Sequence, residues 1–308
     1  MYAEMPLNKY ITFWMQTFKQ KSVKPATYSR LKTSAKALSQ FSIAKKKLQD
    51  ITAFDVQNYV NELTDYGYGM TTIKKQLCIV TAPLKQAAAL HFISADPTVG
   101  VALPTPNRVL KEKRETRPYS TEEQRLLWQA ILDSNKPAWL CLGFMIETGL
   151  RVGEALALEW QNVDTERHKL KVEATILNLA DGQRSIYQAS PKTISSRRAV
   201  PLTDKALALL EKIKKLSQGR WVFEGRNGER LSYEALRYQT KKACEQAGIP
   251  YLGEHVFRHT FATNCYYKGM DVKVLSKLLG HADVNITYNI YISLQDDGFN
   301  DMYRALCS

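Results

Sequence analysis

Cysteine is scarce in this 308-residue sequence, and the few cysteines follow no recognisable pattern. The five cysteines are scattered, and none forms a Cys-x-x-Cys pair. An odd, dispersed set argues against a disulfide framework and against a structural zinc site. The sequence therefore predicts reduced thiols in a cytosolic protein, with no metal ion and no other cofactor.

Long apolar segments are also missing. No apolar run approaches the roughly 18 residues that a membrane-spanning helix needs. The first residues, MYAEMPLNKYITFW, lack the basic start, apolar core and small-residue cleavage site of a signal peptide. With 44% hydrophobic and 24% charged residues, the composition is typical of a folded chain with one large or two ordinary domains. We therefore expect no membrane partner.

Acidic residues are in deficit. The chain holds 43 Lys and Arg against 30 Asp and Glu, a formal net charge of +13. Residues 1–107 alone hold 13 basic residues against 6 acidic ones. Such an excess favours a polyanionic partner. Because no basic amphipathic helix with a large aromatic face is evident, nucleic acid fits better than an anionic membrane. A basic protein without such a partner is the alternative.

The first third of the chain has the periodicity of helices. Apolar residues recur every three or four positions in four segments, residues 8–20, 26–41, 52–67 and 70–92. Lys32 and Lys36 lie one turn apart on the second segment, and Lys74 and Lys85 lie three turns apart on the fourth. We predict a helical bundle over residues 1–105 whose basic outer faces bind DNA. A solvated charged face would show the same pattern.

A basic linker at residues 106–118 separates this bundle from a second domain, residues 119–308. Ser120 and, three positions later, Glu123 form a predicted capping box at the start of that domain. Further on, helical patterns alternate with two segments that favour strands, residues 168–179 and 184–202. The predicted fold is mainly α with a small antiparallel sheet (α+β).

The segment GEHVFRHTFATN, residues 253–264, concentrates polar groups on one helix. His255 and His259 have the spacing of a zinc-binding helix. However, Val256 stands where a His-Glu-x-x-His motif has its glutamate, and Arg258 would repel the metal ion. An anion is the better ligand. A guanidinium group pairs with phosphate oxygens, and a histidine transfers protons near neutral pH.

Other segments supply the remaining groups of a phosphoryl-transfer site. TGLRVGEALALEW places Arg151 at the start of a helix, with Glu154 one turn on to hold it by a local ion pair. SPKTISSRRAVPL places Lys192 in a turn between two predicted strands. LLGHADVNITYNIYISL supplies His281, Tyr288 and Tyr291.

Taken in order, these motifs resemble those of the tyrosine recombinase (phage integrase) family. The resemblance lies in TGLRVGEALAL, PKT, HVFRHTFAT, LLGH and a tyrosine ten residues after that histidine. The order and the gaps match over the second domain. The resemblance implies a helical core-site DNA-binding domain, followed by a catalytic domain with a C-terminal docking tail.

The resemblance also implies a role for each matched cationic residue. Arg151 and Arg258 would clamp the non-bridging oxygens of the scissile phosphate, and His281 would hydrogen-bond to a phosphate oxygen. Lys192 would protonate the 5′-oxygen as it leaves. Glu154 would hold Arg151 in position without contacting the phosphate itself.

The nucleophile implied by the resemblance is Tyr291, which would attack the phosphorus and become a 3′-phosphotyrosine. Tyr288, three positions earlier, is the competing candidate. His255 would assist proton transfer at the nucleophile, whereas His259 is expected to pack or hydrogen-bond within the fold. A phenol is a poor nucleophile at neutral pH, and nearby cations would lower its pKa.

The function implied is site-specific recombination, in which two duplexes are cut and rejoined through a Holliday junction without metal or ATP. The expected partners are double-stranded DNA sites and three further copies of the chain, with accessory DNA-bending proteins as further candidates. Arg197 and Arg198 are expected to contact the DNA backbone or a neighbouring protomer. The expected location is the cytoplasm of a prokaryote, at the nucleoid or on mobile-element DNA.

Two other functions are consistent with the same sequence features. A type IB topoisomerase performs much the same chemistry on one duplex, and a DNA-binding regulator could retain the fold without cleavage. The bundle, the linker and the tail favour a recombinase, and six competent catalytic side chains argue against a regulator. Many integrases carry an additional N-terminal arm-binding domain, whereas this sequence begins almost at the core-site domain. Phage integration, transposition and chromosome-dimer resolution therefore all stay open, as does the target sequence.

Overall fold

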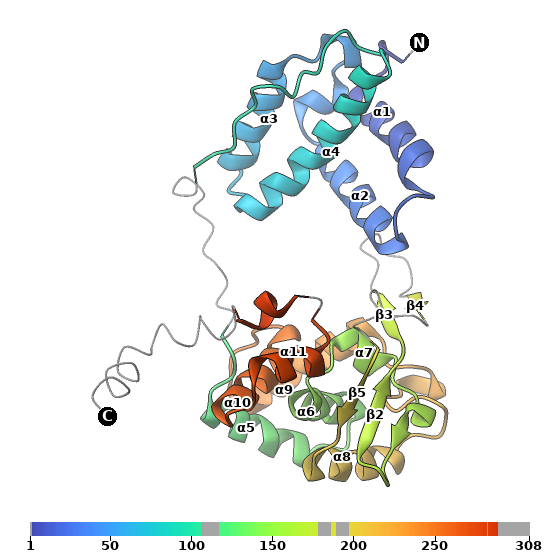
Figure 1. Ribbon diagram of the computed structural model, residues 1–308, viewed down its shortest axis with the longest axis vertical. Helices are drawn as coiled ribbons and strands as arrows, with labels where there is room; N and C mark the ends of the chain where they lie inside the picture. Colours follow the sequence, from blue (N-terminus) through green and yellow to red (C-terminus); the bar gives the residue numbers. More distant parts are fainter. Residues whose placement is uncertain (1, 106–116, 178–185, 189–196, 282, 289–308) are drawn as a thin grey trace, which may run out of the picture. The chain divides into compact units, whose positions relative to one another are not determined.

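The computed structural model describes residues 2–105, 117–177, 186–188, 197–281 and 283–288. These residues form two compact units, an N-terminal unit that ends before the linker and a C-terminal unit that follows it (Figure 1). Each unit has its own hydrophobic core. Helices predominate in both, which confirms the predicted fold class. None of the described helices is long and apolar enough to cross a bilayer.

Four α-helices make up most of the described N-terminal unit, and each coincides with a predicted segment. Their bounds are Leu7–Trp14 (α1, continued by a π-helical turn, Met15–Lys19), Pro25–Leu38 (α2), Ala53–Asp65 (α3) and Met70–Ala89 (α4). The helix α3 begins with a capping box, in which Thr52 accepts from the Asp55 amide and the Asp55 carboxylate accepts from the Thr52 amide. The buried residues Tyr10, Tyr59 and Leu84 join α1, α3 and α4 in one core.

The C-terminal unit is organised around one central helix, Pro137–Thr148 (α6). Ten of its twelve residues are buried, and a helix that is apolar on every side has to be covered on every side. The covering helices are Thr121–Leu132 (α5), Asp204–Lys214 (α8), Tyr233–Ala247 (α9) and His255–Tyr267 (α10). Two shorter helices of the described part of the unit are Val152–Leu156 (α7) and Val272–Leu279 (α11).

The strands form two small antiparallel sheets. One contains Val163–Asp164 (β1), Lys169–Val172 (β2) and Arg198–Pro201 (β5), in the order β1-β2-β5. The other pairs Thr175–Leu177 (β3) with Ile186–Gln188 (β4). The first predicted strand segment is therefore interrupted between Val172 and Thr175. In the β2–β5 pair, Val172 lies opposite Arg198, which places that arginine at the end of the sheet.

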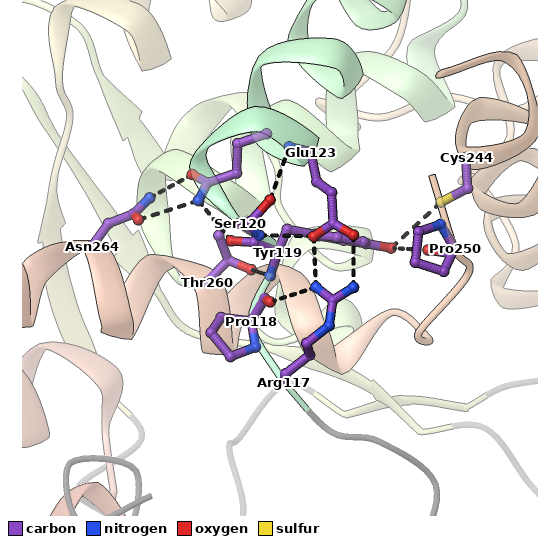
Figure 2. Close-up of polar contacts among 10 residues, drawn as sticks. Arg117, Pro118, Tyr119, Ser120, Glu123, Cys244, Pro250, Thr260 and Asn264 are labelled. Carbon is purple, nitrogen blue, oxygen red and sulfur yellow. Dashed lines mark hydrogen bonds and ion pairs between the residues drawn. The ribbon is translucent and has the colours of Figure 1, made fainter. Parts of the chain in front are cut away.

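The entry into the C-terminal unit is fixed to α10 by a set of polar contacts (Figure 2). The predicted capping box is confirmed, because Ser120 accepts from the Glu123 amide and Glu123 accepts from the Ser120 amide. Both oxygens of Glu123 also accept from Arg117, at 2.6 and 2.7 Å. The buried Tyr119 donates its amide to Thr260 Oγ1 at 3.0 Å. The first residues after the linker are thus held against the helix that carries His255 and Arg258.

Candidate active site

The motif TGLR forms a sharp junction between α6 and α7. Gly149 ends α6 in a left-handed conformation (φ 65°), and a Cβ there would collide with the ring of Phe261 on α10. Glycine is therefore required for both the backbone angle and the close approach of α10. Two residues later, Arg151 occupies the N-cap position of α7. The junction therefore places Arg151 close to α10, the helix that carries Arg258.

Glu154 is the buried acidic centre of the site. Its Oε1 accepts from Arg151 Nη1 at 2.8 Å, which confirms the predicted local ion pair. Its Oε2 accepts from the Arg151 amide at 2.9 Å. The side chain of Glu154 is only 3% exposed. Burial would raise the pKa of this carboxyl, but its bonds with Arg198 and Arg151 outweigh burial and lower the pKa to about 2.

Arg258 extends from α10 into the interior and is 5% exposed. Its guanidinium donates to the carbonyl of Gly149 at 2.8 Å and to that of Leu279 at 2.6 Å. Removal from water lowers the pKa of Arg258 to about 9, and the positive charge of Arg151 contributes to this shift. These bonds fix the plane of the guanidinium without neutralising its charge.

Three arginines from other elements donate hydrogen bonds to backbone carbonyls at the C-terminal end of α11. The last carbonyls of a helix lack intrahelical partners and carry the negative end of its dipole. The Leu278 carbonyl accepts from Arg198 Nε at 2.5 Å. The Leu279 carbonyl accepts from Arg258, and the Gly280 carbonyl accepts from Arg151 Nη2 at 2.9 Å. Three consecutive carbonyls therefore set the positions of three guanidinium groups.

His281 follows this row directly. Its Nδ1 is 2.7 Å from the hydroxyl of Thr287, which is completely buried. Burial is the largest cause that lowers the pKa of His281 to about 4, and the positive charges of Arg258, Arg151 and Arg198 contribute to the same shift. The ring is thus neutral at physiological pH, with its orientation fixed through Nδ1.

The two histidines of α10 differ in their surroundings. His255 keeps an exposed edge, but removal of the rest of the ring from water lowers its pKa, as do Arg258 and Arg151. His259 is half-buried, and its Nδ1 has no hydrogen-bond partner among the described residues. Burial lowers its pKa too. His255 therefore lies near the arginines, whereas Nδ1 of His259 has no hydrogen-bond partner among the described residues.

The described part of the cluster carries an excess of positive charge. Arg151 and Arg198 pair with one buried carboxylate, Glu154, and Arg258, which donates to backbone carbonyls, adds a third positive charge nearby. A bound phosphate would supply the missing negative charge and accept hydrogen bonds from guanidinium and imidazole groups. In the part of the chain that the structure describes, no three His, Cys, Asp or Glu side chains gather in a metal-binding arrangement.

The structure brings together four of the six predicted catalytic residues. Arg151 bonds to Glu154, and Arg258, His255 and His281 lie close enough to Arg151 to interact with it electrostatically. Lys192 and Tyr291 lie outside the described residues, as does the tail. The alternative nucleophile, Tyr288, is 53% exposed.

The prediction for Arg198 was wrong. Its side chain is 6% exposed and forms two hydrogen bonds with the oxygens of Glu154, so it does not reach a DNA backbone or a neighbouring protomer from the surface. Only its neighbour Arg197 is exposed. The sequence carries one usable signal for this difference. Successive residues of a strand face opposite sides, so where one face is covered, as the apolar Val200 two positions on indicates for Arg198, only one of the two arginines points to solvent.

The four lysines predicted to bind DNA are all exposed on helices of the N-terminal unit. Lys32 and Lys36 line a hollow between α1 and α2 together with Lys9. The ammonium group of Lys32 lies 5.3 Å from the centre of the Tyr28 ring. Lys74 and Lys85 are both on α4. The exposure that DNA contact would need is present at all four positions.

Comparison with known proteins identifies the family of this chain. Residues 120–297 match the model of the phage integrase family. A tyrosine recombinase XerC-like protein of Caldanaerobacter subterraneus subsp. tengcongensis is 28% identical over 94% of this chain and 80% of its own length. The fold is similar to that of the Tn1549 transposon integrase in complex with a circular intermediate DNA, with a TM-score of 0.79, 17% identity, and coverage of 93% of this chain and 95% of that one.

A lambda integrase tetramer bound to a Holliday junction is also similar in fold, with a TM-score of 0.70, 19% identity, and coverage of 93% of this chain and 77% of that one. The family match spans more than half of the chain. The motifs from Arg151 to His281 lie inside it. This chain therefore belongs to the phage integrase family, and it is a tyrosine-type site-specific DNA recombinase.

Proposed function

We propose that this chain cuts and rejoins DNA through a covalent 3′-phosphotyrosine at Tyr291. The observation that carries the proposal is the row of three arginines at the end of α11, next to His281 and His255. Such a row offers fixed positive charge to a phosphate whose negative charge increases in the pentavalent transition state. Because side chains supply the positive charge, the scheme requires no metal ion.

In the proposed reaction, Arg151 and Arg258 hold the two non-bridging oxygens of the scissile phosphate. His281, with Nδ1 engaged by Thr287, presents Nε2 to a phosphate oxygen. The Tyr291 oxygen forms a bond with phosphorus while the bond from phosphorus to the 5′-oxygen breaks. Lys192 gives a proton to that leaving oxygen.

His255 accepts the phenolic proton at the start of the step, which suits an imidazole whose lowered pKa keeps it neutral. The reverse reaction returns the phosphate to a 5′-hydroxyl. The energy of the original phosphodiester is kept in the phosphotyrosine, so rejoining needs no other source.

The assembly proposed is a homotetramer on two DNA duplexes, with the residues after Tyr291 docking on a neighbouring protomer. The solved lambda integrase tetramer on a Holliday junction supports this arrangement by its similarity in fold. The N-terminal unit, residues 1–105, is proposed as the core-site DNA-binding domain, and residues 106–118 as a basic linker. Accessory DNA-bending proteins are a further proposed partner, and the proposed location is the prokaryotic cytoplasm.

The test is covalent capture. A target duplex selected from random DNA is nicked so that the cleaved end diffuses away, and it is incubated with the protein in EDTA. The wild-type protein and the Tyr288→Phe variant should form an adduct that survives a denaturing gel, whereas Tyr291→Phe should form none. An adduct that persists in Tyr291→Phe would refute the assigned nucleophile. No adduct from wild-type protein on a duplex that it binds would refute cleavage altogether.

A further inference from the structure

We propose that Arg198 is a positioning residue for DNA cleavage, which holds Glu154 and through it the phosphate-binding Arg151. The inference rests on the proposed function. It assigns a role to an arginine that touches neither the scissile phosphate nor the nucleophile in the proposed scheme.

The contacts of Arg198 connect three separate elements. The residue belongs to β5 and donates from Nη1 and Nη2 to the two oxygens of Glu154 on α7, at 3.1 and 2.9 Å. Its Nε donates to the Leu278 carbonyl at the end of α11, at 2.5 Å. One planar group thus fixes the distance between the helix that carries Arg151 and the helix end that precedes His281.

The geometry of this bond requires arginine. The two parallel N–H groups match the two carboxylate oxygens, while the third direction of the fork reaches the carbonyl. A lysine at this position would keep the charge but has one ammonium group on a flexible stem, so it cannot make all three bonds in fixed directions. The charge and the geometry can therefore be separated by substitution.

Glu154 needs this second partner to hold Arg151 in one place. Its Oε1 is shared by Arg151 Nη1 and Arg198 Nη1. The side chain of Arg151 is 33% exposed, whereas that of Arg198 is 6% exposed. The buried arginine therefore fixes the carboxylate from the inside, and the carboxylate fixes the exposed arginine at the surface.

A purely structural role fits these contacts less well. Replacing a buried ion pair by apolar groups of similar size is often neutral for stability or even stabilising, so stability alone is a weak reason to bury one. Well-defined geometry is what such a pair supplies, and catalysis depends steeply on it. A displacement of about 1 Å at a positioning group can cost on the order of a hundredfold in rate.

The experiment separates DNA affinity from the cleavage rate at saturating DNA. Four proteins are compared in single-turnover adduct formation with the nicked duplex, namely wild type, Arg198→Lys, the paired replacement Glu154→Gln with Arg198→Met, and Arg167→Lys. Arg167 is an exposed arginine of the same unit, in the turn between β1 and β2, and serves as the matched control. The paired replacement removes one buried carboxylate and one buried guanidinium together, so neither member of that pair is left without its partner and the net charge of the cluster is unchanged.

We expect Arg198→Lys and the paired replacement to bind the duplex with wild-type affinity. Both should cleave it more slowly, by on the order of a hundredfold. Arg167→Lys should match wild type in both readouts. If either altered protein cleaves at the wild-type rate in a saturated complex, or if both lose affinity and cleavage in proportion, the positioning role is refuted. Failure of the proposed function looks different, because the wild-type protein itself would then form no adduct.

Discussion

The two units use positive charge in opposite ways. In the N-terminal unit the lysines assigned to DNA, such as Lys32 and Lys74, are exposed on the outer faces of helices. In the C-terminal unit Arg258 and Arg198 are buried, and carbonyl and carboxylate oxygens fix their directions. Exposed lysines attract a polyanion without fixing a single phosphate, whereas buried arginines define one position.

This difference assigns different tasks to the two kinds of cation. Flexible ammonium groups on a surface contribute affinity and long-range attraction that salt screens. Guanidinium groups held by a helix end contribute little to the search for DNA, but they stabilise charge where it develops during reaction. Affinity and cleavage should therefore respond separately to substitutions in the two units.

The largest difference between the effect on cleavage rate and the effect on DNA affinity is expected at Arg258. Arg258→Ala removes a fixed charge from the proposed phosphate site, and the rate of adduct formation should fall by roughly a hundredfold to a thousandfold. Affinity for the duplex should change little, because the many exposed cations supply most of it. Adduct formation at saturating DNA and a gel-shift titration measure the two quantities. An equal loss in both would contradict the division of tasks.

A large effect on stability is expected at Gly149. Gly149→Ala adds both a left-handed alanine and a collision with Phe261. Gly269→Ala, after α10, adds a left-handed alanine with open space around it (φ 78°). We expect Gly269→Ala to cost about 1 kcal/mol and Gly149→Ala about 1–3 kcal/mol more, in the calorimetric transition of the C-terminal unit. Equal costs would show that α10 does not pack against the TGLR junction as described.

Substitution of the exposed lysines should lower DNA affinity and leave the cleavage rate unchanged, the opposite of the result expected for Arg258→Ala. Lys32→Ala and Lys36→Ala should weaken DNA binding and reduce the slope of log affinity against log salt by about 0.9 for each lost phosphate contact. Cleavage within the isolated complex should keep its wild-type rate. The matched control is Lys47→Ala, because Lys47 is exposed in the same unit but already pairs with Glu4. An unchanged salt slope would remove Lys32 and Lys36 from the DNA interface.

The smallest expected effect is the pH dependence of the free protein. The folded state lowers the pKa of His281 from its usual 6.5 to about 4, so the unfolded chain binds the proton more tightly. The contribution of His281 to the free energy of unfolding is fully present above pH 6.5 and is lost as the pH falls toward 4. Glu154 contributes in the same direction only below its usual pKa of 4.5.

Thermal melting of wild type and His281→Gln between pH 7.5 and 5 tests this effect. The wild-type melting temperature should fall more steeply than that of the variant as the medium becomes acidic. Identical slopes would show that burial and the neighbouring cations do not lower the pKa of this histidine.

Local features of the fold and site could be predicted from the sequence. Periodicity located the four helices of the N-terminal unit, and cap chemistry located the start of α5 at Ser120. The pair of Arg151 and Glu154 follows from helical spacing. Each of these depends on residues within one turn of each other, so the sequence contains all the information that fixes them.

Features that depend on distant segments could not be predicted in the same way. Arg198 is buried because α7 and α11 meet at the end of β5, and no local pattern encodes that meeting. The carbonyl row of residues 278–280 is a backbone feature, which side-chain motifs do not reveal. The break between β2 and β3 likewise depends on their separate partners, β5 and β4.

The most direct test of the account is the titration of its histidines in a DNA complex. The chain has five histidines, so selective ¹⁵N labelling resolves them. In Tyr291→Phe protein bound to the uncleaved duplex, a phosphate among the arginines should raise the pKa of His281 above its free value of about 4. If His281 and His255 titrate alike in the free protein and in a saturated complex, the arginine cluster is not the phosphate site.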